Sequence, residues 1–362
     1  MSLLALPSAR DEAWRWSDLS GLPAIADAKP TGQPRSVDDL WIDTPGPRLL
    51  FVDGAYDASR SNPGPVQIGP ADANAGRHAL GKLAGSTGWT LTLGRDCATE
   101  GPVQIVHVAT GGANHLAADI RLDEDAQASI VESFVGEGWV NRAASLRLAR
   151  SARLMVARRF LHESGFQSHA DTAEIGQAAS LTIASLVAGE ADSRLDGHLT
   201  ITGIEAFAEA GGALLGRKKQ RHDAAFVVRH AAAHGQSRQL WRAVADEQAV
   251  TSASARVEVT RDAQKTDGEQ SLRGLLMART AAVNLKPELE IFADDVKCGH
   301  GATVGELDRN SLFYLASRGI PPVEARAILT HAFVADALAR IGEDAVREAF
   351  EATANSWLGM IA

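Results

Sequence analysis

Ala128-Ser-Ile-Val131 shares a sequence pattern with two later stretches, Ala152-Arg-Leu-Met155 and Ala179-Ser-Leu-Thr182. In each stretch, alanine and one further residue are followed by a pair of residues whose first member is aliphatic. They are spaced by 24 and then 27 residues. A period of about 20–50 residues with a strand in each repeat is typical of a solenoid, whose stacked coils bury a shared interior. Chance repetition in an alanine-rich chain is the competing explanation. Long amphipathic helices are missing between residues 90 and 285, which disfavours a βαβ fold and favours the solenoid.

The spacing of apolar residues and the content of glycine and proline divide the chain into three regions. Residues 1–45 combine short amphipathic segments with Gly/Pro-rich linkers and predict N-terminal helical segments. Residues 46–305 carry many short apolar runs with period-two alternation, which predict strands and a mainly β core. Residues 306–362 show apolar positions three and four apart and predict a C-terminal helical domain.

The C-terminal region carries clear helix boundaries. A first helix is expected over Asp308–Ser317, a second begins at Pro321-Pro322, and a third covers Glu343–Leu358. Gly319 suits the position just after the first helix, where glycine adopts a left-handed conformation without strain. Proline is tolerated in the first turn of the second helix because its missing N–H would be unpaired there.

Composition limits the class of protein. The 362 residues include 36 Lys and Arg against 45 Asp and Glu, a formal charge of −9, which argues against nucleic-acid binding. Cys97 and Cys298 stand far apart, so neither a disulfide framework nor a CxxC metal knuckle is expected, and a reducing compartment fits best. No signal peptide and no apolar run of membrane-spanning length are evident, so we expect a cytoplasmic chain without membrane contact.

Several catalytic and nucleotide-binding motifs are absent. The glycines at Gly136 and Gly138 lack the third glycine of a dinucleotide fingerprint, and Gly211–Gly216 is followed by Arg-Lys-Lys where a P-loop needs Lys and Ser/Thr. No GxSxG nucleophile elbow occurs. His230 and His234 are four apart but lack the glutamate of HExxH, so we interpret them as ordinary core or surface histidines.

One segment, Ile291 to Val304, carries a constellation of potential ligands. If it is a strand, Cys298 and His300 project from the same face, two residues apart. A thiolate beside an imidazole suits iron, zinc, an iron–sulfur cluster or a thiol–base pair, but two ligands do not close a metal site. A buried cysteine with a turn-capping histidine is the structural alternative. Asp294 and Asp295 are more typical of turn residues, and Cys97 is expected to be a packing residue.

The C-terminal half of the sequence resembles the SufB/SufD family of iron–sulfur cluster assembly proteins. The resemblance is dense over about residues 260 to 340 and rests on Gln264-Lys-Thr-Asp-Gly-Glu-Gln270, Leu275-Leu276, Lys286-Pro-Glu-Leu-Glu-Ile291, Ala293-Asp-Asp-Val296, Cys298-Gly-His-Gly-Ala-Thr-Val-Gly305 and Leu312-Phe-Tyr-Leu-Ala-Ser-Arg-Gly-Ile320. It implies a right-handed parallel β-helix core flanked by N-terminal helical segments and a C-terminal helical domain.

The resemblance also implies a function, that of a noncatalytic scaffold subunit in the SUF system. The Cys298-Gly-His300-Gly-Ala pattern is similar to the SufD side of the family, which implies pairing with SufB through the β-helix and docking of the ATPase SufC by the helical domain. Gly299 stands where serine is common in the family. ATP hydrolysis is then expected in SufC. The isolated chain is expected to hold no cofactor stably, and whether it forms a homodimer in the absence of its partners is left open.

By position, Cys298 and His300 are implied as candidate cluster or iron ligands at the SufB interface, where a nascent cluster forms and iron is acquired, with flavin in the complex left open. Arg318, Gly319 and Ile320 are the candidate SufC contact; a helix C-cap is their structural alternative. Two other functions are carried forward, a cytoplasmic β-helix carbohydrate-active enzyme and a purely structural self-associating protein. Scarce aromatic residues and scattered carboxylates argue against the enzyme.

Overall fold

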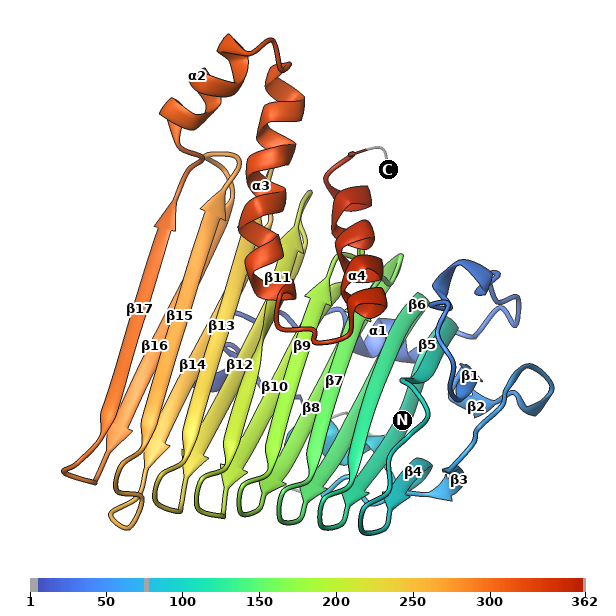
Figure 1. Ribbon diagram of the computed structural model, residues 1–362. Coiled ribbons are helices and arrows are strands. Elements are labelled where there is room, and N and C mark those ends of the chain that lie inside the picture. Colours follow the sequence, from blue (N-terminus) through green and yellow to red (C-terminus); the bar gives the residue numbers. More distant parts are fainter. Residues whose placement is uncertain (1–5, 75–77, 361–362) are drawn as a thin grey trace.

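The computed structural model describes residues 6–74 and 78–360, and its main body is a parallel β-solenoid (Figure 1). Its strands, in chain order, are β5 (Val103–Leu122), β6 (Gln127–Leu148), β7 (Arg153–Phe160), β8 (Ser164–Ile175), β9 (Ser180–Val187), β10 (Asp192–Ile201), β11 (Phe207–Gly216), β12 (Arg221–His230), β13 (Gln236–Ala245), β14 (Val250–Val259), β15 (Asp267–Leu276), β16 (Ala282–Ile291) and β17 (Lys297–Gly305). The predicted mainly β fold with a parallel solenoid core is confirmed.

Each turn of the solenoid contributes two strands, and a strand pairs with its equivalents one turn before and one turn after. Thus β8, β10, β12, β14 and β16 form one face, and β7, β9, β11, β13, β15 and β17 form the other. Side chains stacked on successive turns are 26 to 32 residues apart, as in Glu132 under Arg158 and Ser252 under Asn284. Alternate residues of both faces point inward and fill the core with aliphatic and aromatic side chains.

The repeated alanines of the sequence lie near the corners of the solenoid, the short turns that join one strand to the next. Ser151 and Ala178 adopt left-handed conformations, with φ of 59° and 52°, and each is followed by a fully buried alanine, Ala152 and Ala179. The equivalent residue in the preceding turn is Ala126, because β6 and β7 align Gln127 with Arg153. The first spacing is therefore 26 residues, and the phrase beginning at Ala128 is two residues out of register. Small side chains recur here because the corner leaves space for little beyond a methyl group.

The N-terminal region lies against one face of the solenoid and closes its first turn. It contains the 3-10 turns η1 (Glu12–Trp14), η2 (Asp38–Leu40), η3 (Ala58–Arg60) and η4 (Gly81–Ala84), helix α1 (Leu22–Asp27), and strands β1 (Arg48–Val52), β2 (Ala55–Tyr56), β3 (Val66–Pro70) and β4 (Thr87–Leu93). Trp14 and Leu22 pack on Trp139 of β6 and Phe166 of β8. The amphipathic segments near residues 12 and 38 form single 3-10 turns, shorter than the helices we predicted.

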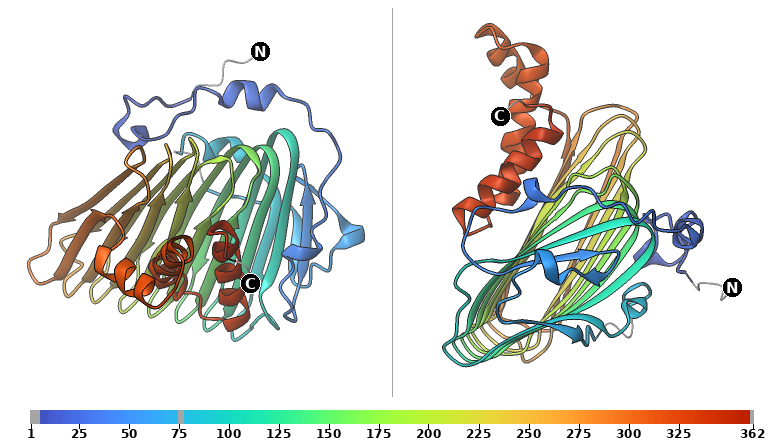
Figure 2. Two further views of the ribbon diagram at one scale, coloured as in Figure 1. Left: turned by 90° about the horizontal axis from the view of Figure 1, so that it is seen from above. Right: turned by 90° about the vertical axis from the view of Figure 1, so that its right-hand side faces the viewer.

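The C-terminal helices lie on the opposite face of the solenoid, as the two views in Figure 2 show. They are α2 (Arg309–Ser317), α3 (Pro322–Leu338) and α4 (Asp344–Trp357), close to the predicted bounds. Val334 of α3 and Phe350 of α4 are fully buried in a cluster with Leu186 and Leu215 from strands β9 and β11. Among the described residues, no helix has the length and apolar character needed to cross a membrane.

Candidate functional site

The C-terminal end of the solenoid is open. Strand β16 pairs with β14, and β17 pairs with β15, and the described strands provide neither with a parallel neighbour on its other side. Figure 1 shows these two strands at the edge of the molecule. Backbone N–H and C=O groups along such edges are available to a further strand. Strand β16 carries residues that edge strands tolerate. They are the charged Lys286 and Glu288 and, in the middle of the strand, Pro287.

Cys298 and His300 lie on β17 and share one face of it. Cys298 is in register with Gly268 on β15, and His300 is in register with Gln270. Gly268 and Gln270 are inward-facing, so the Cys/His pair belongs to the interior face of the last turn. Strand β16 ends at Ile291 and a turn precedes β17, so the alternation from Ile291 onward is not one continuous strand, although the predicted same-face placement of the pair holds.

The Cys298 thiol is half-buried at the rim of the core. It packs beside Val257, Val259 and Ala293. Burial raises the pKa of the Cys298 thiol, and the negative charge of Asp267 adds to that shift, while the backbone N–H of Gly268 offsets part of it. The thiol therefore carries its proton at neutral pH in this chain alone, and a nearby cation would be needed to favour the thiolate.

The His300 imidazole is exposed at the open end of the solenoid. Among the described residues it has no hydrogen-bond partner, and the strand below presents the buried side chain of Gln270. His300 thus combines an accessible ring with a polar neighbour inside the solenoid. A ring in this position can bind a ligand that approaches from beyond the last turn.

The donor set at the open end is incomplete for a metal. In residues 6–74 and 78–360 no three His, Cys, Asp or Glu side chains come together in an arrangement that could hold an ion. Asp295 forms an ion pair with Lys265 across a turn, and Asp294 is exposed, so the interpretation of both as turn residues fits the structure. A tetrahedral metal site usually needs four ligands, and Cys298 and His300 are only two potential donors.

The other segments considered from sequence have structural roles. His230 ends β12, is fully buried and bonds to Ser237 Oγ at 2.8 Å, whereas His234 lies in a corner with φ of 59°, so the two do not share a helix face. Gly211–Gly216 runs within strand β11 and forms no phosphate-binding loop. Cys97 is exposed, so the expectation that it is a packing residue is wrong.

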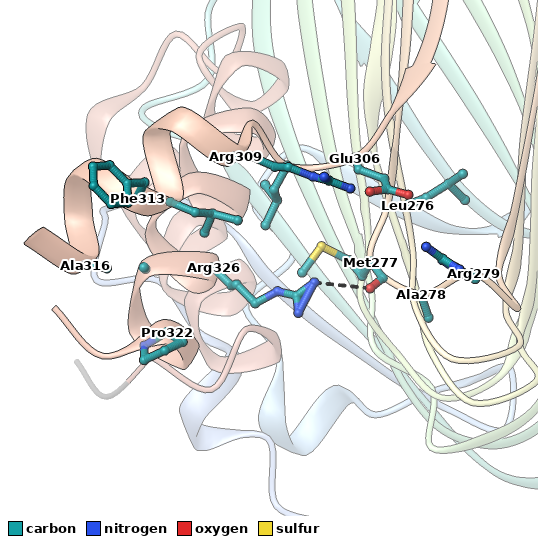
Figure 3. A pocket seen from close by; sticks show the side chains of 13 residues that line it. Leu276, Met277, Ala278, Arg279, Glu306, Arg309, Phe313, Ala316, Pro322 and Arg326 are labelled. Atoms are coloured by element: carbon teal, nitrogen blue, oxygen red, sulfur yellow. Dashed lines mark hydrogen bonds between the residues drawn. The ribbon is translucent and has the colours of Figure 1, made fainter.

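A second surface, missed by the sequence analysis, lies on α2 and the start of α3. Phe313, Tyr314 and Val323 are 76%, 57% and 80% exposed. Phe313 also lines a cavity of about 550 Å³ between these helices and the end of β15, where Met277 lies on the solenoid side (Figure 3). Arg326 of α3 crosses the cavity and donates to the Met277 carbonyl at 3.4 Å. Large apolar side chains gathered outside a core are typical of interaction surfaces.

Arg318, Gly319 and Ile320 form the tip between α2 and α3. Gly319 has φ of 83°, and the N–H groups of Gly319 and Ile320 bond to carbonyls in the last turn of α2, which confirms the helix cap. The Arg318 guanidinium lies 5.3 Å from the Tyr314 ring centroid. The three residues adjoin the exposed surface of α2 and α3, and their role in binding a partner stays a prediction.

Together these features define a class of protein, a parallel β-solenoid with C-terminal helices and with a cysteine and a histidine on one face of its last strand. The sequence comparisons narrow this class. Residues 106–333 match the family described as SUF system FeS cluster assembly, SufBD core domain, and the chain belongs to this family.

Similar proteins include the iron-sulfur cluster assembly protein SufD of Escherichia coli, 27% identical over 95% of this chain and 87% of the relative. A SufBD family protein of Synechocystis is 27% identical over 93% and 84%, and one of Mycobacterium tuberculosis is 28% identical over 95% and 87%. These alignments run through nearly the whole chain, so its likeness to these relatives extends beyond the core domain.

Proposed function

We propose that this chain is the noncatalytic scaffold subunit that pairs with SufB and docks the ATPase SufC during iron–sulfur cluster assembly. The observation that carries the proposal is the position of Cys298 and His300, inward-facing donors on the last strand of an open solenoid. A pair that is incomplete within its own chain and lies at an available edge is suited to a site shared with a second chain.

The open end supports pairing with SufB. Strands β16 and β17 offer unpaired edges of ten and nine residues on the two faces of the solenoid. A second solenoid whose last strands pair with them would continue both faces and extend the interior across the joint. The same edges are open to a second copy of this chain, which makes a homodimer the competing assembly when SufB is absent.

The chemistry of the shared site follows from the two donors. The imidazole of His300 is a borderline ligand for iron, and the thiolate of Cys298 is a soft one. Because burial favours the neutral thiol, iron or a cluster from the partner side would have to displace the Cys298 proton. In this proposal His300 therefore receives iron first, and Cys298 binds once the cation lowers the pKa of the thiol.

The helical domain supports docking of SufC. Phe313, Tyr314 and Val323 form an apolar surface beside the Arg318–Ile320 tip. Helix α2, which carries two of these residues, lies beyond the end of β17 in Figure 1. Since the one P-loop-like glycine pattern lies within strand β11, ATP hydrolysis is assigned to the partner. Movement in SufC would reach this chain through α2 and then through α3, which packs on β9, β11 and β13.

Co-expression with SufB and SufC under anaerobic, iron-replete conditions tests the proposal. The wild-type complex is expected to be coloured, and His300→Ala is expected to lose iron and colour while the three chains still copurify. His198→Ala, an exposed histidine on β10, is the matched control and should keep the colour. Normal cluster content in His300→Ala would exclude a ligand role for this residue, and failure of the three chains to copurify would reject the scaffold assignment.

A further inference from the structure

A ladder of two buried glutamines leads to His300 through the interior of the solenoid. Gln239 on β13 is in register with Gln270 on β15, and Gln270 is in register with His300 on β17. The two glutamines are 1% and 2% exposed. One inward position thus carries a polar side chain on three successive turns.

Both glutamines make the same contact with the facing side of the solenoid. Gln239 Nε2 donates to the Arg256 carbonyl at 2.9 Å, and Gln270 Nε2 donates to the Glu288 carbonyl at 3.2 Å. Arg256 and Glu288 are themselves in register on β14 and β16. Each amide is therefore held in a fixed orientation by a hydrogen bond to the backbone of the facing strand.

Each amide nevertheless keeps one unused acceptor. The Oε1 atoms of Gln239 and Gln270 are buried, and the described residues provide neither with a hydrogen-bond partner. An unsatisfied buried carbonyl oxygen is unfavourable, so these atoms are strong acceptors for a donor that comes within reach. The turn after Gln270 carries such a donor, the N–H of the His300 ring.

The distance between the two side chains is set by the sheet. Parallel strands lie about 4.8 Å apart, so side chains in register on neighbouring strands start from adjacent points. The His300 ring is exposed and has no hydrogen-bond partner among the described residues, so the side chain is free to rotate toward Gln270 on the neighbouring strand. Rotation of the His300 side chain would be needed to bring a ring nitrogen to Gln270 Oε1.

We propose that Gln270 is a positioning residue for His300, whose ring N–H donates to Gln270 Oε1 so that the other ring nitrogen presents its lone pair to the open end of the solenoid. This inference rests on the proposed ligand role of His300. Histidines that bind metals commonly donate their second nitrogen to a carbonyl or carboxylate oxygen, which fixes both the tautomer and the direction of the ring.

The test is the tautomer of His300, measured by NMR on the full chain with ¹⁵N-labelled histidine near pH 8. The His300 signals are assigned by comparison with His300→Gln. In Gln270→Met, which has similar length but lacks the amide, the ratio of the two tautomers should shift by about fivefold, the factor that one ordinary hydrogen bond supplies. Gln239→Met is the matched control, because it removes the equivalent amide two turns from His300 and should leave the ratio unchanged.

Gln270→Glu is the conservative rescue, since it keeps an acceptor oxygen at the same position and should preserve the wild-type tautomer. An equal ratio in wild type, Gln270→Met and Gln239→Met would overturn the proposal, and so would loss of the wild-type tautomer in Gln270→Glu. If Gln270→Met does not fold, Gln270→Leu takes its place, with the same shift expected and an unchanged ratio overturning the proposal. The cluster content of His300→Ala is a separate measurement, so a failed ligand role is distinguishable from a failed positioning role.

Discussion

Gly268 and Cys298 face each other on the last two strands of their side of the solenoid, and Cys298 Sγ lies 3.4 Å from the point that a Cβ on Gly268 would occupy. The thiol therefore packs directly over the Gly268 backbone, close to Val257. Burial at this position raises the pKa of the Cys298 thiol, and the Gly268 N–H offsets part of that shift. The neighbouring strand thus contributes both to the burial of the thiol and to the partial offset of its pKa.

Slow alkylation of Cys298 is the first prediction. In a Cys97→Ser background, Cys298 should react with iodoacetamide at pH 8 about tenfold more slowly in the folded chain than in urea. Burial has two effects here, because it limits access of the reagent and keeps the thiol protonated. The rate should rise only above the pH at which an ordinary cysteine ionises. Cys97, measured in a Cys298→Ser background, is exposed and should differ little between the two states. Equal rates for folded and unfolded Cys298 would contradict the assigned environment.

The second prediction concerns the apolar surface of α2. Phe313→Ala should weaken SufC binding about tenfold, as expected for truncating a large aromatic contact, without lowering the stability of the free chain, because this side chain is 76% exposed. Titration calorimetry with purified SufC measures the affinity. Phe292→Ala is the control, since this phenylalanine is 58% exposed in the β16–β17 turn, away from α2. Unchanged affinity in Phe313→Ala would remove α2 from the docking surface.

The third prediction follows from buried histidines in the solenoid interior. Burial lowers the pKa of His222 and of His230 to about 4. In the unfolded chain each would titrate near 6.5, so between these values the unfolded state binds more protons than the folded state. Stability is therefore full above about pH 6.5 and falls as the pH drops toward 4, by on the order of 2 kcal/mol for each histidine at pH 5.

Urea denaturation at pH 7.5 and pH 5 checks the third prediction. His222→Gln should reduce the difference in unfolding free energy between the two pH values by about 2 kcal/mol, whatever it costs in packing. Leu199→Ala, an interior change on β10 without an ionisable group, should lower stability equally at both pH values. If the His222→Gln difference matches that of wild type, His222 is not the source of the pH dependence.

The C-terminal helices and the strand that carries the donor pair could be predicted because their signals are local. Asp308 caps α2 by accepting from the N–H groups of Asn310 and Ser311, and Gly319 ends the helix with a positive φ. Each signal spans a few residues and needs no knowledge of the rest of the fold. The alternation around Cys298 and His300 is equally local, and the structure bears out their shared face.

Pairing between turns could not be predicted in the same way. Gln270 lies under His300 although the two are 30 residues apart, while other stacked residues are separated by 26 or 32. Corner length varies from turn to turn, so alternation alone does not fix the register. The same variation placed Ala128 two residues away from the true corner. For the same reason, an interior ion pair such as that of Arg158 with Asp171, at 2.7 Å, could not be predicted from the sequence.

The last prediction tests the corners that set this variable register. Ala178 has φ of 52°, a conformation that costs an L-residue about 1 kcal/mol and costs glycine almost nothing. Ala178→Gly should therefore raise the free energy of unfolding, by up to about 1 kcal/mol, less the added entropy of glycine in the unfolded chain. Ala179→Gly, the buried neighbour, should instead lower it, because this methyl group fills the corner. Urea titration of both variants measures the two opposite shifts, and a destabilised Ala178→Gly would show that the left-handed corner is not strained.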